Sequence, residues 1–570
     1  MKADLKKIWA ILNPGERRKS GLMVVLVILM AFAETVGVVS IMPFLSVLAR
    51  PEVIHDVPAL QWLYGKLAPE NERGFIVVLG LASILLVVGS SLFKTFTLHA
   101  INRFTYSLRH GISARLLSGY LGQPYEFFLK HNPSELARNV LSEVDQLHGG
   151  LIKPLAQLFA QGAVVLAMVI VLFLYDPWVA VGATALVALL YGVIYLLVRK
   201  RLGLTGKARQ AENGARFKAC NEVLGGIKDV KISGAINAYQ QRFQGASRSY
   251  SRHQANAETL SQSPLYIVEA VGYTGLICLS LFLMQRTEDI AQVLPVLGLY
   301  GFAAYRILPS AQIMYRGLAQ LKFSSAALDV ISRDVSLSSE HRFAGAALRP
   351  LSNIRLENVR FCYPSTPNKP VFDDFNLTIP VNTSVGIVGM SGAGKSTVMD
   401  LFLGLLQPEK GRLLVDDLEI KPSNVANWQC SIGYVPQHIF LADLSVAENI
   451  AFGVPKHEID MEAVKSAAQM AHIHNFVVEQ LPLGYETTIG DRGVRLSGGQ
   501  RQRIGIARAL YRNPSVLFMD EATSALDQET ETAITESIGE LSGLKTVVII
   551  AHREASLRFC DQVRILGNHE

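Results

Sequence analysis

The feature that most constrains this fold is a set of six long apolar segments in the first 320 of 570 residues. Each is long enough to cross a bilayer, since a spanning helix needs roughly 17–25 mostly apolar residues. We place the segments at 21–48, 75–100, 153–174, 177–198, 265–285 and 291–315. The sequence therefore predicts an all-α six-helix transmembrane domain over 1–335, a linker over 336–352 and a separate domain over 353–570, whose composition is typical of soluble proteins.

The distribution of Lys and Arg predicts the orientation of these segments. Residues 1–20, 101–150 and 199–263 hold six, five and twelve of them, against four on the opposite side, at Arg50, Lys66, Arg73 and Arg286. Positive loops stay in the cytoplasm, so we expect both termini, the two long connections and the soluble domain there. The connections have helical periodicity, which predicts helices that continue into water. A cleaved signal peptide at the first segment would leave five spans, so we expect no cleavage.

The net charge and the cysteines argue against a nucleic-acid-binding protein and against a zinc or disulfide-rich protein. A net charge of +6 is too small to indicate a nucleic-acid partner when a membrane explains it. The five cysteines are scattered and form no CxxC, so neither a zinc site nor a disulfide framework is expected.

Several ionisable residues lie within or beside the predicted spans. A charge at membrane depth costs a few kcal/mol, so it faces a partner or a wet cavity. Two interpretations remain open: interhelical pairing, and a cavity for a polar or anionic cargo. The candidate cavity residues are Glu34, Lys94, Glu269 and Arg306. Between the first two spans, Leu60, Trp62, Leu63, Tyr64 and Leu67 have helical spacing, which favours a short helix lying on the outer leaflet over a plain loop.

The soluble part contains a phosphate-binding loop. The apolar strand SVGIVG leads into Gly389-x-x-x-x-Gly394-Lys395-Ser396, and a helical pattern follows. In this context the backbone N–H groups cradle phosphates, Lys395 neutralises the β/γ oxygens and the Ser396 hydroxyl binds Mg²⁺.

Three further strand ends complete this site. In SVLFMDEATSALD, Asp520 ends a buried strand and can reach the Mg²⁺, and Glu521 can polarise the attacking water. His552 ends the strand VVIIAH and can hydrogen-bond the γ-phosphate, and Gln437 in YVPQ can touch both the metal and the water. Tyr363, ahead of the loop, can stack on adenine or serve as an ordinary strand aromatic.

A second potential anion site raises a question. In the stretch GVRLSGGQRQRIGIARAL, Gly498 and Gly499 follow Ser497 and open an amphipathic helix, as at an anion-binding helix N-terminus. The chain already has one phosphate loop, so the purpose of a second is not evident from the motif itself.

The order of these motifs answers the question. The P-loop, YVPQ, LSGGQRQR, LFMDEATSALD and AHR together resemble the nucleotide-binding domain of ABC ATPases, over 353–570. The resemblance implies an α/β P-loop domain with a helical subdomain, ATP and Mg²⁺ as cofactors, and a head-to-tail dimer. In that dimer each LSGGQ loop covers ATP held by the other subunit's P-loop. The resemblance implies that the nucleotide is bound by Tyr363, Gly389, Ser391, Gly392, Ala393, Gly394, Lys395, Ser396, Thr397, Ser497, Gly498, Gly499 and Gln500. It implies that Ser396, Gln437 and Asp520 bind the metal. The catalytic residues that it implies are Glu521, His552 and Gln437.

Six spans followed by one such domain resemble an exporter-type half-transporter. The stretches FAETVGVVSIMPFLSVLA, SPLYIVEAVGY and AAYRILPSAQ resemble lipid-linked oligosaccharide flippases of the PglK type. This resemblance implies an ATP-driven homodimeric flippase of the bacterial inner membrane that moves a lipid-linked glycan among membrane lipids. A multidrug or lipid A-type exporter, a heterodimer and a non-transporting channel are the alternatives. A soluble DNA-repair ATPase would have coiled coils in place of the spans and is excluded.

Overall fold

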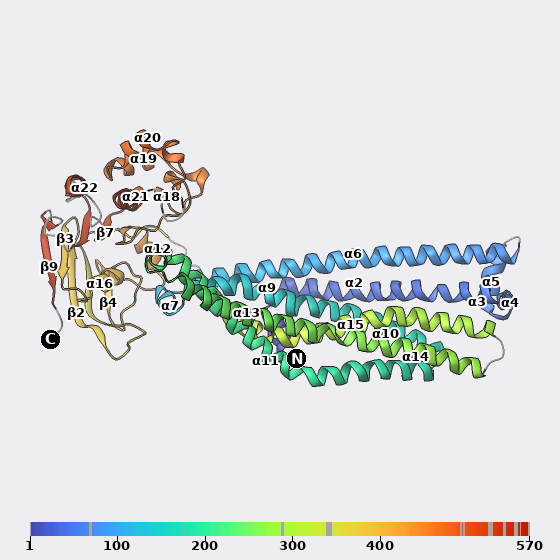
Figure 1. Cartoon of the computed structure of the whole chain (residues 1–570). Helices are drawn as coiled ribbons and strands as arrows, with labels where there is room; N and C mark the ends of the chain where they lie inside the picture. Colours follow the sequence, from blue (N-terminus) through green and yellow to red (C-terminus); the bar gives the residue numbers. More distant parts are fainter. Residues whose placement is uncertain are drawn as a thin grey trace. The chain divides into compact units, whose positions relative to one another are not determined.

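The computed structural model contains two compact units, Met1–Gln123 with His131–Ser339, and Pro124–Lys130 with Glu340–Glu570 (Figure 1). The structure describes residues 2–67, 71–175, 177–286, 290–337, 345–490, 493, 496–521, 528–539, 543–551, 557–558 and 560–567. The first unit is helical and the second combines sheets with helices, which confirms the predicted fold class.

Long helices make up the first unit, and they extend well beyond the predicted apolar segments. Asn71 begins the 50-residue α6 by accepting a hydrogen bond from the Gly74 N–H (2.8 Å), as an N-cap does. The helices of this unit are α1 (Lys2–Ile11), α2 (Pro14–Val39), α3 (Ile41–Ala49), α4 (Val53–Asp56), α5 (Pro58–Leu67), α6 (Glu72–Leu121), α8 (Pro133–Arg138), the π-helical turn η1 (Asn139–Glu143), α9 (Val144–Leu147), the π-helical turn η2 (His148–Ile152), α10 (Lys153–Tyr175), α11 (Pro177–Gly225), α12 (Ile227–Ile232), α13 (Ile236–Gln262), α14 (Pro264–Arg286) and α15 (Ile290–Val335).

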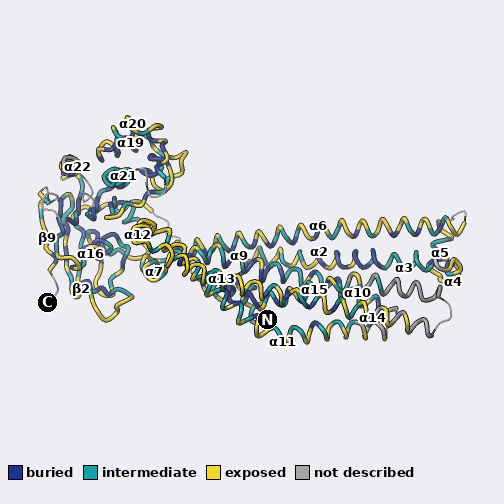
Figure 2. Tube along the Cα trace, viewed as in Figure 1, coloured by how far each residue is buried: buried dark blue, intermediate teal, exposed yellow. Residues whose placement is uncertain are grey.

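Four helical stretches among the described residues are long and apolar enough to cross a membrane: Pro14–Leu48, Glu72–Leu121, Pro133–Leu174 and Ala180–Gly225. They contain the first three predicted spans and all but the first three residues of the fourth, 177–198. The fifth and sixth coincide with α14 and α15, parts of which lie outside the described residues, so the count of six remains a prediction. Figure 2 shows exposed positions along α6. Leu81, Leu85 and Leu92 of this helix are exposed, as expected for a helix that faces lipid.

The segment between the first two spans is helical, as predicted. However, most of its apolar face packs against other helices and is not available to contact a lipid leaflet. Leu60 of α5 is buried in a cluster with Val47, Phe75 and Leu79 of α3 and α6, and Leu63 and Tyr64 pack against that cluster, while Trp62 stays exposed. Most of this face therefore stabilises the helix bundle itself.

The second unit contains two sheets. A four-stranded antiparallel sheet has the order β2-β1-β4-β5, and a five-stranded parallel sheet has the order β6-β7-β8-β3-β9. The strands are β1 (Asn353–Cys362), β2 (Pro370–Pro380), β3 (Ser384–Gly389), β4 (Lys410–Val415), β5 (Leu418–Glu419), β6 (Ile432–Val435), β7 (Val516–Asp520), β8 (Thr546–Ile550) and β9 (Gln562–Leu566). Every residue of β7 is buried, as in a parallel sheet covered on both faces.

Helices cover this sheet and form a separate group. Figure 1 shows α18, α19, α20 and α21 together at one side of the unit, and α19 and α18 both contact α21. The helices are α7 (Tyr125–Lys130), α16 (Lys395–Phe402), α17 (Val425–Gln429), α18 (Val446–Ile450), the 3-10 turn η3 (Lys456–Glu458), α19 (Met461–Met470), α20 (His474–Gln480), the 3-10 turn η4 (Gly484–Glu486), α21 (Gly498–Tyr511) and α22 (Gln528–Gly539).

Candidate functional site

The phosphate loop connects β3 to α16, as the sequence predicts. Gly394 has a φ of +88°, and a Cβ there would lie 2.5 Å from the Phe372 ring, so only glycine fits. Lys395 Nζ donates hydrogen bonds to the carbonyls of Gly389 (2.8 Å) and Met390 (3.1 Å), which directs its ammonium into the loop. Ala393 is buried, whereas Ser391 and Ser396 are exposed. The loop can thus present backbone N–H groups and one cation to a phosphate chain.

Tyr363 lies beside this loop. Its hydroxyl is 2.9 Å from Thr397 Oγ1 on α16, and its ring contacts Phe361 edge to face. The side chain is half-buried against the core of the unit. The position is compatible with an aromatic surface next to a bound nucleotide, and the hydrogen bond with Thr397 also gives Tyr363 a structural part.

The parallel sheet brings the other predicted residues to the same edge. Gln437, the P-loop and Glu521 follow β6, β3 and β7, and the carboxyl ends of parallel strands meet at one edge of a sheet. Gln437 Nε2 donates a hydrogen bond to Glu521 Oε2 (2.8 Å), so these two side chains are in direct contact. His552 follows β8 but lies outside the described residues.

The backbone at Glu521 has an unusual conformation. Its φ is +48°, uncommon for a non-glycine residue, and its N–H donates to the Ile550 carbonyl (3.0 Å). Residues in this region cost of the order of 1–3 kcal/mol and persist where the surrounding structure fixes them, often at functional sites. The preceding Asp520 is buried at the end of β7.

A second carboxyl group, half-buried and not singled out by the sequence, lies near Asp520. Burial, and then the negative charge of Asp520, raise the pKa of Asp400 on α16 to about 6. The only sequence signal was an acidic residue within the apolar pattern VMDLF of the P-loop helix.

The raised pKa predicts a pH-dependent stability. Because the folded-state pKa of Asp400 exceeds the ordinary value of 3.8 for an aspartate, the folded state binds more protons than the unfolded state between these two values, and stability increases as pH falls from 7 towards 4. At pH 7.5 the Asp400→Asn variant removes a half-buried charge. A rise of about two in the pKa corresponds to a destabilisation of the folded state by at most about 3 kcal/mol, and the partial exposure of the carboxylate makes this destabilisation smaller.

We therefore expect Asp400→Asn to raise the melting temperature at pH 7.5 by about 3–6 °C and to have no such effect at pH 4.5. Differential scanning fluorimetry of the full chain, without nucleotide and with EDTA, measures both. Asp443→Asn, at an exposed position, is the matched control. An equal melting temperature for Asp400→Asn and wild type at pH 7.5 would contradict the prediction.

The stretch LSGGQ forms a capped helix start. Ser497 Oγ accepts a hydrogen bond from the Gln500 N–H (3.2 Å), and Gln500 Oε1 accepts one from the Ser497 N–H (2.8 Å), which is a capping box. Ser497 is exposed and Gly498 and Gly499 are half-buried. The helix N-terminus at α21 thus presents N–H groups at a surface rather than into the core.

Arg508 of α21 also was not predicted. Its guanidinium donates hydrogen bonds to the carbonyls of Phe440 (2.7 Å) and Asn449 (2.8 Å) and lies over the Phe452 ring. Burial lowers its pKa to about 10, below the ordinary value of 12.5. Arg508 thereby connects the LSGGQ helix to the segment that follows Gln437.

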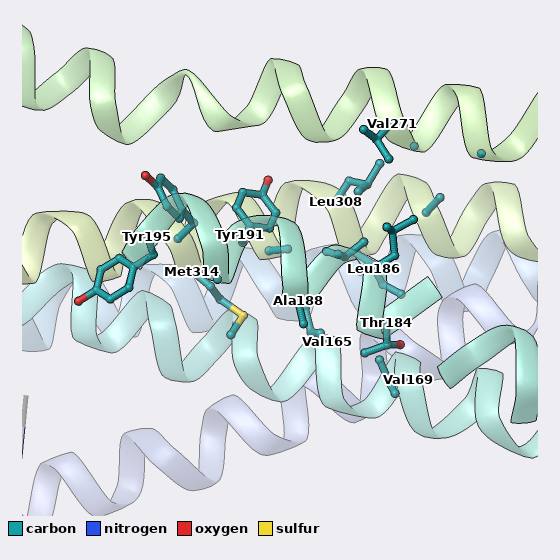
Figure 3. A pocket seen from close by; sticks show the side chains of 18 of the residues that line it. Val165, Val169, Thr184, Leu186, Ala188, Tyr191, Tyr195, Val271, Leu308 and Met314 are labelled. Carbon is teal, nitrogen blue, oxygen red and sulfur yellow. The ribbon is translucent and has the colours of Figure 1, made fainter. Parts of the chain in front are cut away.

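The first unit contains an apolar cavity of about 580 Å³ between α10, α11, α14 and α15. Its lining is apolar apart from Thr184 and the hydroxyl groups of three tyrosines, and none of the described lining residues is charged. Figure 3 shows Tyr191 and Tyr195 towards one end and Val169 and Thr184 towards the other. The cavity therefore has a hydrocarbon-like interior with phenol groups near one end.

Three of the four residues predicted for a charged cavity have side chains that the structure describes, Glu34, Lys94 and Glu269. Lys94 Nζ donates to Glu34 Oε1 (2.7 Å), and Glu34 is only 2% exposed, so this pair joins α6 to α2 and does not line the cavity. Of the two interpretations, pairing describes these two residues. Glu269 is half-buried on α14, next to Val268 of the cluster with Tyr191 and Tyr315. The Arg306 side chain lies outside the described residues.

Two family models match this chain. The model described as ABC transporter transmembrane region matches residues 19–293, and the model described as ABC transporter matches residues 372–524. The ATP-dependent lipid A-core flippase of Chromohalobacter salexigens is 30% identical over 478 residues, which cover 81% of this chain and 79% of that protein. The chain belongs to the ABC transporter family. Its ABC domain is an ATPase that couples hydrolysis to transport, and the chain is an integral membrane protein.

Other comparisons extend over nearly the whole transporter. The lipid A-core flippase of Ralstonia nicotianae is 28% identical over 577 residues, 98% of this chain and 91% of that protein. A bacterial Atm1-family ABC exporter with ATP bound has the same fold, with a TM-score of 0.78 and 23% identity over 98% of this chain and 95% of that one. One transmembrane domain fused to one ABC domain is the architecture of a half-transporter.

Proposed function

We propose that this ABC transporter moves an amphipathic lipid from the inner to the outer leaflet of a bacterial inner membrane. The observation that carries the proposal is the apolar cavity between α10, α11, α14 and α15. A mostly apolar lining, with no charge among its described residues, suits a hydrocarbon chain, because burying apolar surface against apolar walls is favourable. The name of the Chromohalobacter and Ralstonia relatives supports a lipid cargo.

The cargo that we propose is a lipid-linked oligosaccharide. The support is the sequence resemblance around Glu34, Glu269 and Arg306 described above. A lipid A-like molecule is the second candidate, favoured by the names of the relatives. Both have hydrocarbon tails for the apolar cavity and differ in the head group, so the tail site does not distinguish them.

ATP and Mg²⁺ would bind at the P-loop edge of the parallel sheet. The Ser396 hydroxyl, Asp520 and Gln437 would hold Mg²⁺, which neutralises phosphate charge, and Lys395 would bind the β/γ oxygens. Glu521, oriented by its hydrogen bond from Gln437, would accept a proton from the attacking water. His552 would stabilise the γ-phosphate from the neighbouring strand end.

The functional unit that we propose is a homodimer with two equivalent sites. Ser497, Gly498, Gly499 and Gln500 would cover the ATP on the P-loop of the second copy, because the capped start of α21 presents its N–H groups at the surface. All motifs are intact on one chain, so two copies complete two sites around a two-fold axis. Both termini and the ABC domain would lie in the cytoplasm, by the Lys and Arg distribution.

Filling the apolar cavity tests the proposal. Ala188 lines the cavity on α11, and Ala185 on the same helix is exposed outside it. In proteoliposomes, we expect polyprenyl-pyrophosphate glycans to stimulate ATP turnover of the wild type. Ala188→Trp should raise the half-maximal lipid concentration about tenfold, about 1.4 kcal/mol, while Ala185→Trp should match the wild type.

The outcomes separate the candidates. Stimulation by lipid A but not by the glycan lipid would establish the second cargo. Stimulation by apolar drugs or plain phospholipid alone would favour a multidrug exporter and contradict the glycan proposal. Equal behaviour of Ala188→Trp and Ala185→Trp would exclude this cavity as the tail site.

A further inference from the structure

A second cavity, of about 230 Å³, lies in the same helical unit and differs in chemistry. Its polar lining consists of three glutamines, two serines and one carboxylate: Gln146, Gln254, Gln320, Ser261, Ser324 and Glu258. They come from α9, α13 and α15, and Leu202 of α11 closes the wall. A single water needs only roughly 10–15 Å³, so the cavity admits a group of several heavy atoms.

The lining residues lie just beyond the ends of four predicted spans. Gln146 precedes the third span, Leu202 follows the fourth, Ser261 precedes the fifth and Gln320 follows the sixth. All four positions are on the side that the charge distribution assigns to the cytoplasm. With this orientation, the predicted spans place the polar cavity near the head groups of the inner leaflet.

The groups that face this cavity are mostly uncharged. The side-chain amides of Gln254 and Gln320 have no hydrogen-bond partner within the described part of the chain. Gln146 Nε2 donates to Ser324 Oγ (2.7 Å), and Glu258 Oε1 accepts from Arg316 (2.9 Å) and Gln262. No Lys or Arg is among the lining residues that the structure describes, so the cavity offers amide and hydroxyl groups and one carboxylate rather than a phosphate site.

Hydrogen bonds connect residues that line the polar cavity with residues that line the apolar cavity. Tyr191, whose ring lines the apolar cavity, donates from its hydroxyl to Gln312 Oε1 (3.0 Å), and Gln312 Nε2 donates to the carbonyl of Ser261 (3.2 Å), which lines the polar cavity. Tyr315, also in the apolar lining, donates to the carbonyl of Leu260 (3.0 Å). The phenol end of the apolar cavity and the polar cavity are thus connected through α11, the end of α13, and α15.

From this arrangement we infer that the polar cavity binds an uncharged, hydroxyl-rich part of the lipid head group, such as a sugar ring. The inference rests on the proposed lipid transport and assigns residues to the head group. Amides carry a donor and an acceptor side by side, which matches the hydroxyls of a sugar. Gln254 and Gln320 make these contacts while the tail occupies the apolar cavity.

The test compares two lipids that differ by one sugar. Polyprenyl pyrophosphate, with and without one N-acetylhexosamine, is titrated into the full-length chain in detergent, and binding is measured by native mass spectrometry. We expect the wild type to bind the sugar lipid about tenfold more tightly, since a net hydrogen bond contributes about 0.5–1.5 kcal/mol and two amides take part. The double variant Gln254→Leu/Gln320→Leu should lose this preference.

Two comparisons keep the test interpretable. Gln241→Leu, at an exposed position of α13 outside the cavity, should retain the wild-type preference. The affinity of the double variant for the sugar-free lipid reports whether the double variant keeps its fold. If that affinity is lost, the single variants Gln254→Leu and Gln320→Leu are measured in place of the double variant. Each single variant should lower the preference by about threefold.

Failures of the inference and of the proposed function give different results. An equal affinity of the wild type for both lipids, or a preference that all variants keep, would overturn the polar cavity as the sugar site. A sugar preference that depends on the glutamines, without stimulation of ATP turnover by either lipid in proteoliposomes, would support the site and contradict the transport of this lipid class.

Discussion

Replacing Glu521 by glutamine should lower ATP turnover about 10²- to 10⁴-fold, the usual contribution of a positioned general base, while leaving ATP binding within about twofold of wild type. Glutamine keeps the size and one acceptor oxygen but cannot accept the proton of the attacking water. The hydrogen bond from Gln437 Nε2 to Glu521 Oε2 is expected to persist through the remaining carbonyl oxygen. The defect should therefore appear in turnover rather than in binding.

Steady-state ATPase assays in nanodiscs, with a fluorescent ATP analogue to measure binding, check this result. Glu536→Gln makes the same chemical change at an exposed position of α22 and should match the wild type. If Glu521→Gln kept more than a tenth of wild-type turnover, another residue would have to activate the water. Gln437→Ala should give a smaller loss, because it removes the residue that orients the carboxylate and one of three proposed Mg²⁺ ligands but leaves the Glu521 carboxylate in place.

The edge of the sheet that carries the candidate ATP site could be predicted from the sequence because it depends on strand ends. Gln437, the loop with Lys395, and Glu521 each follow an apolar strand, and parallel strands place their carboxyl ends together, so the sequence predicts that these three residues lie near one another. The positive φ at Glu521 and the neighbouring carboxyl of Asp400 were not predicted, because neither is encoded in local periodicity. Both result from the way α16 and β8 pack on β7.

In the helical unit, the sequence predicts the helices but not the contacts between their side chains. Span lengths follow from apolar runs and the helical extensions from the periodicity of the connections, but neither pattern gives the partners of the side chains within the helices. Lys94 meets Glu34, sixty residues away, and the polar cavity gathers residues from 146 to 324. The crossing of helices decides these contacts, since any face of a long apolar helix can meet a neighbour or lipid.

Replacing Glu143 by alanine should destabilise the helical unit by about 3–5 kcal/mol, because it leaves a buried charge without its partner. Glu143, at the end of η1, is fully buried, and Arg209 of α11 is 2% exposed. Arg209 Nη2 lies 3.4 Å from Glu143 Oε2, and Asn213, one turn further along α11, lies 3.5 Å from the other carboxylate oxygen. Loss of the carboxylate affects both α11 contacts together.

The matched double variant Glu143→Leu/Arg209→Met distinguishes a lost charge pair from lost packing. Removing both charges and retaining apolar volume should restore most of the stability, since such replacements are often neutral or stabilising. Glu222→Ala, which breaks the exposed pair with Arg242 (2.9 Å), should cost less than about 1 kcal/mol. Thermal unfolding of the purified full chain in one detergent measures all three. A Glu143→Ala variant as stable as Glu222→Ala would mean that water reaches Arg209, and a double variant as unstable as Glu143→Ala would place the effect in packing around η1 rather than in charge.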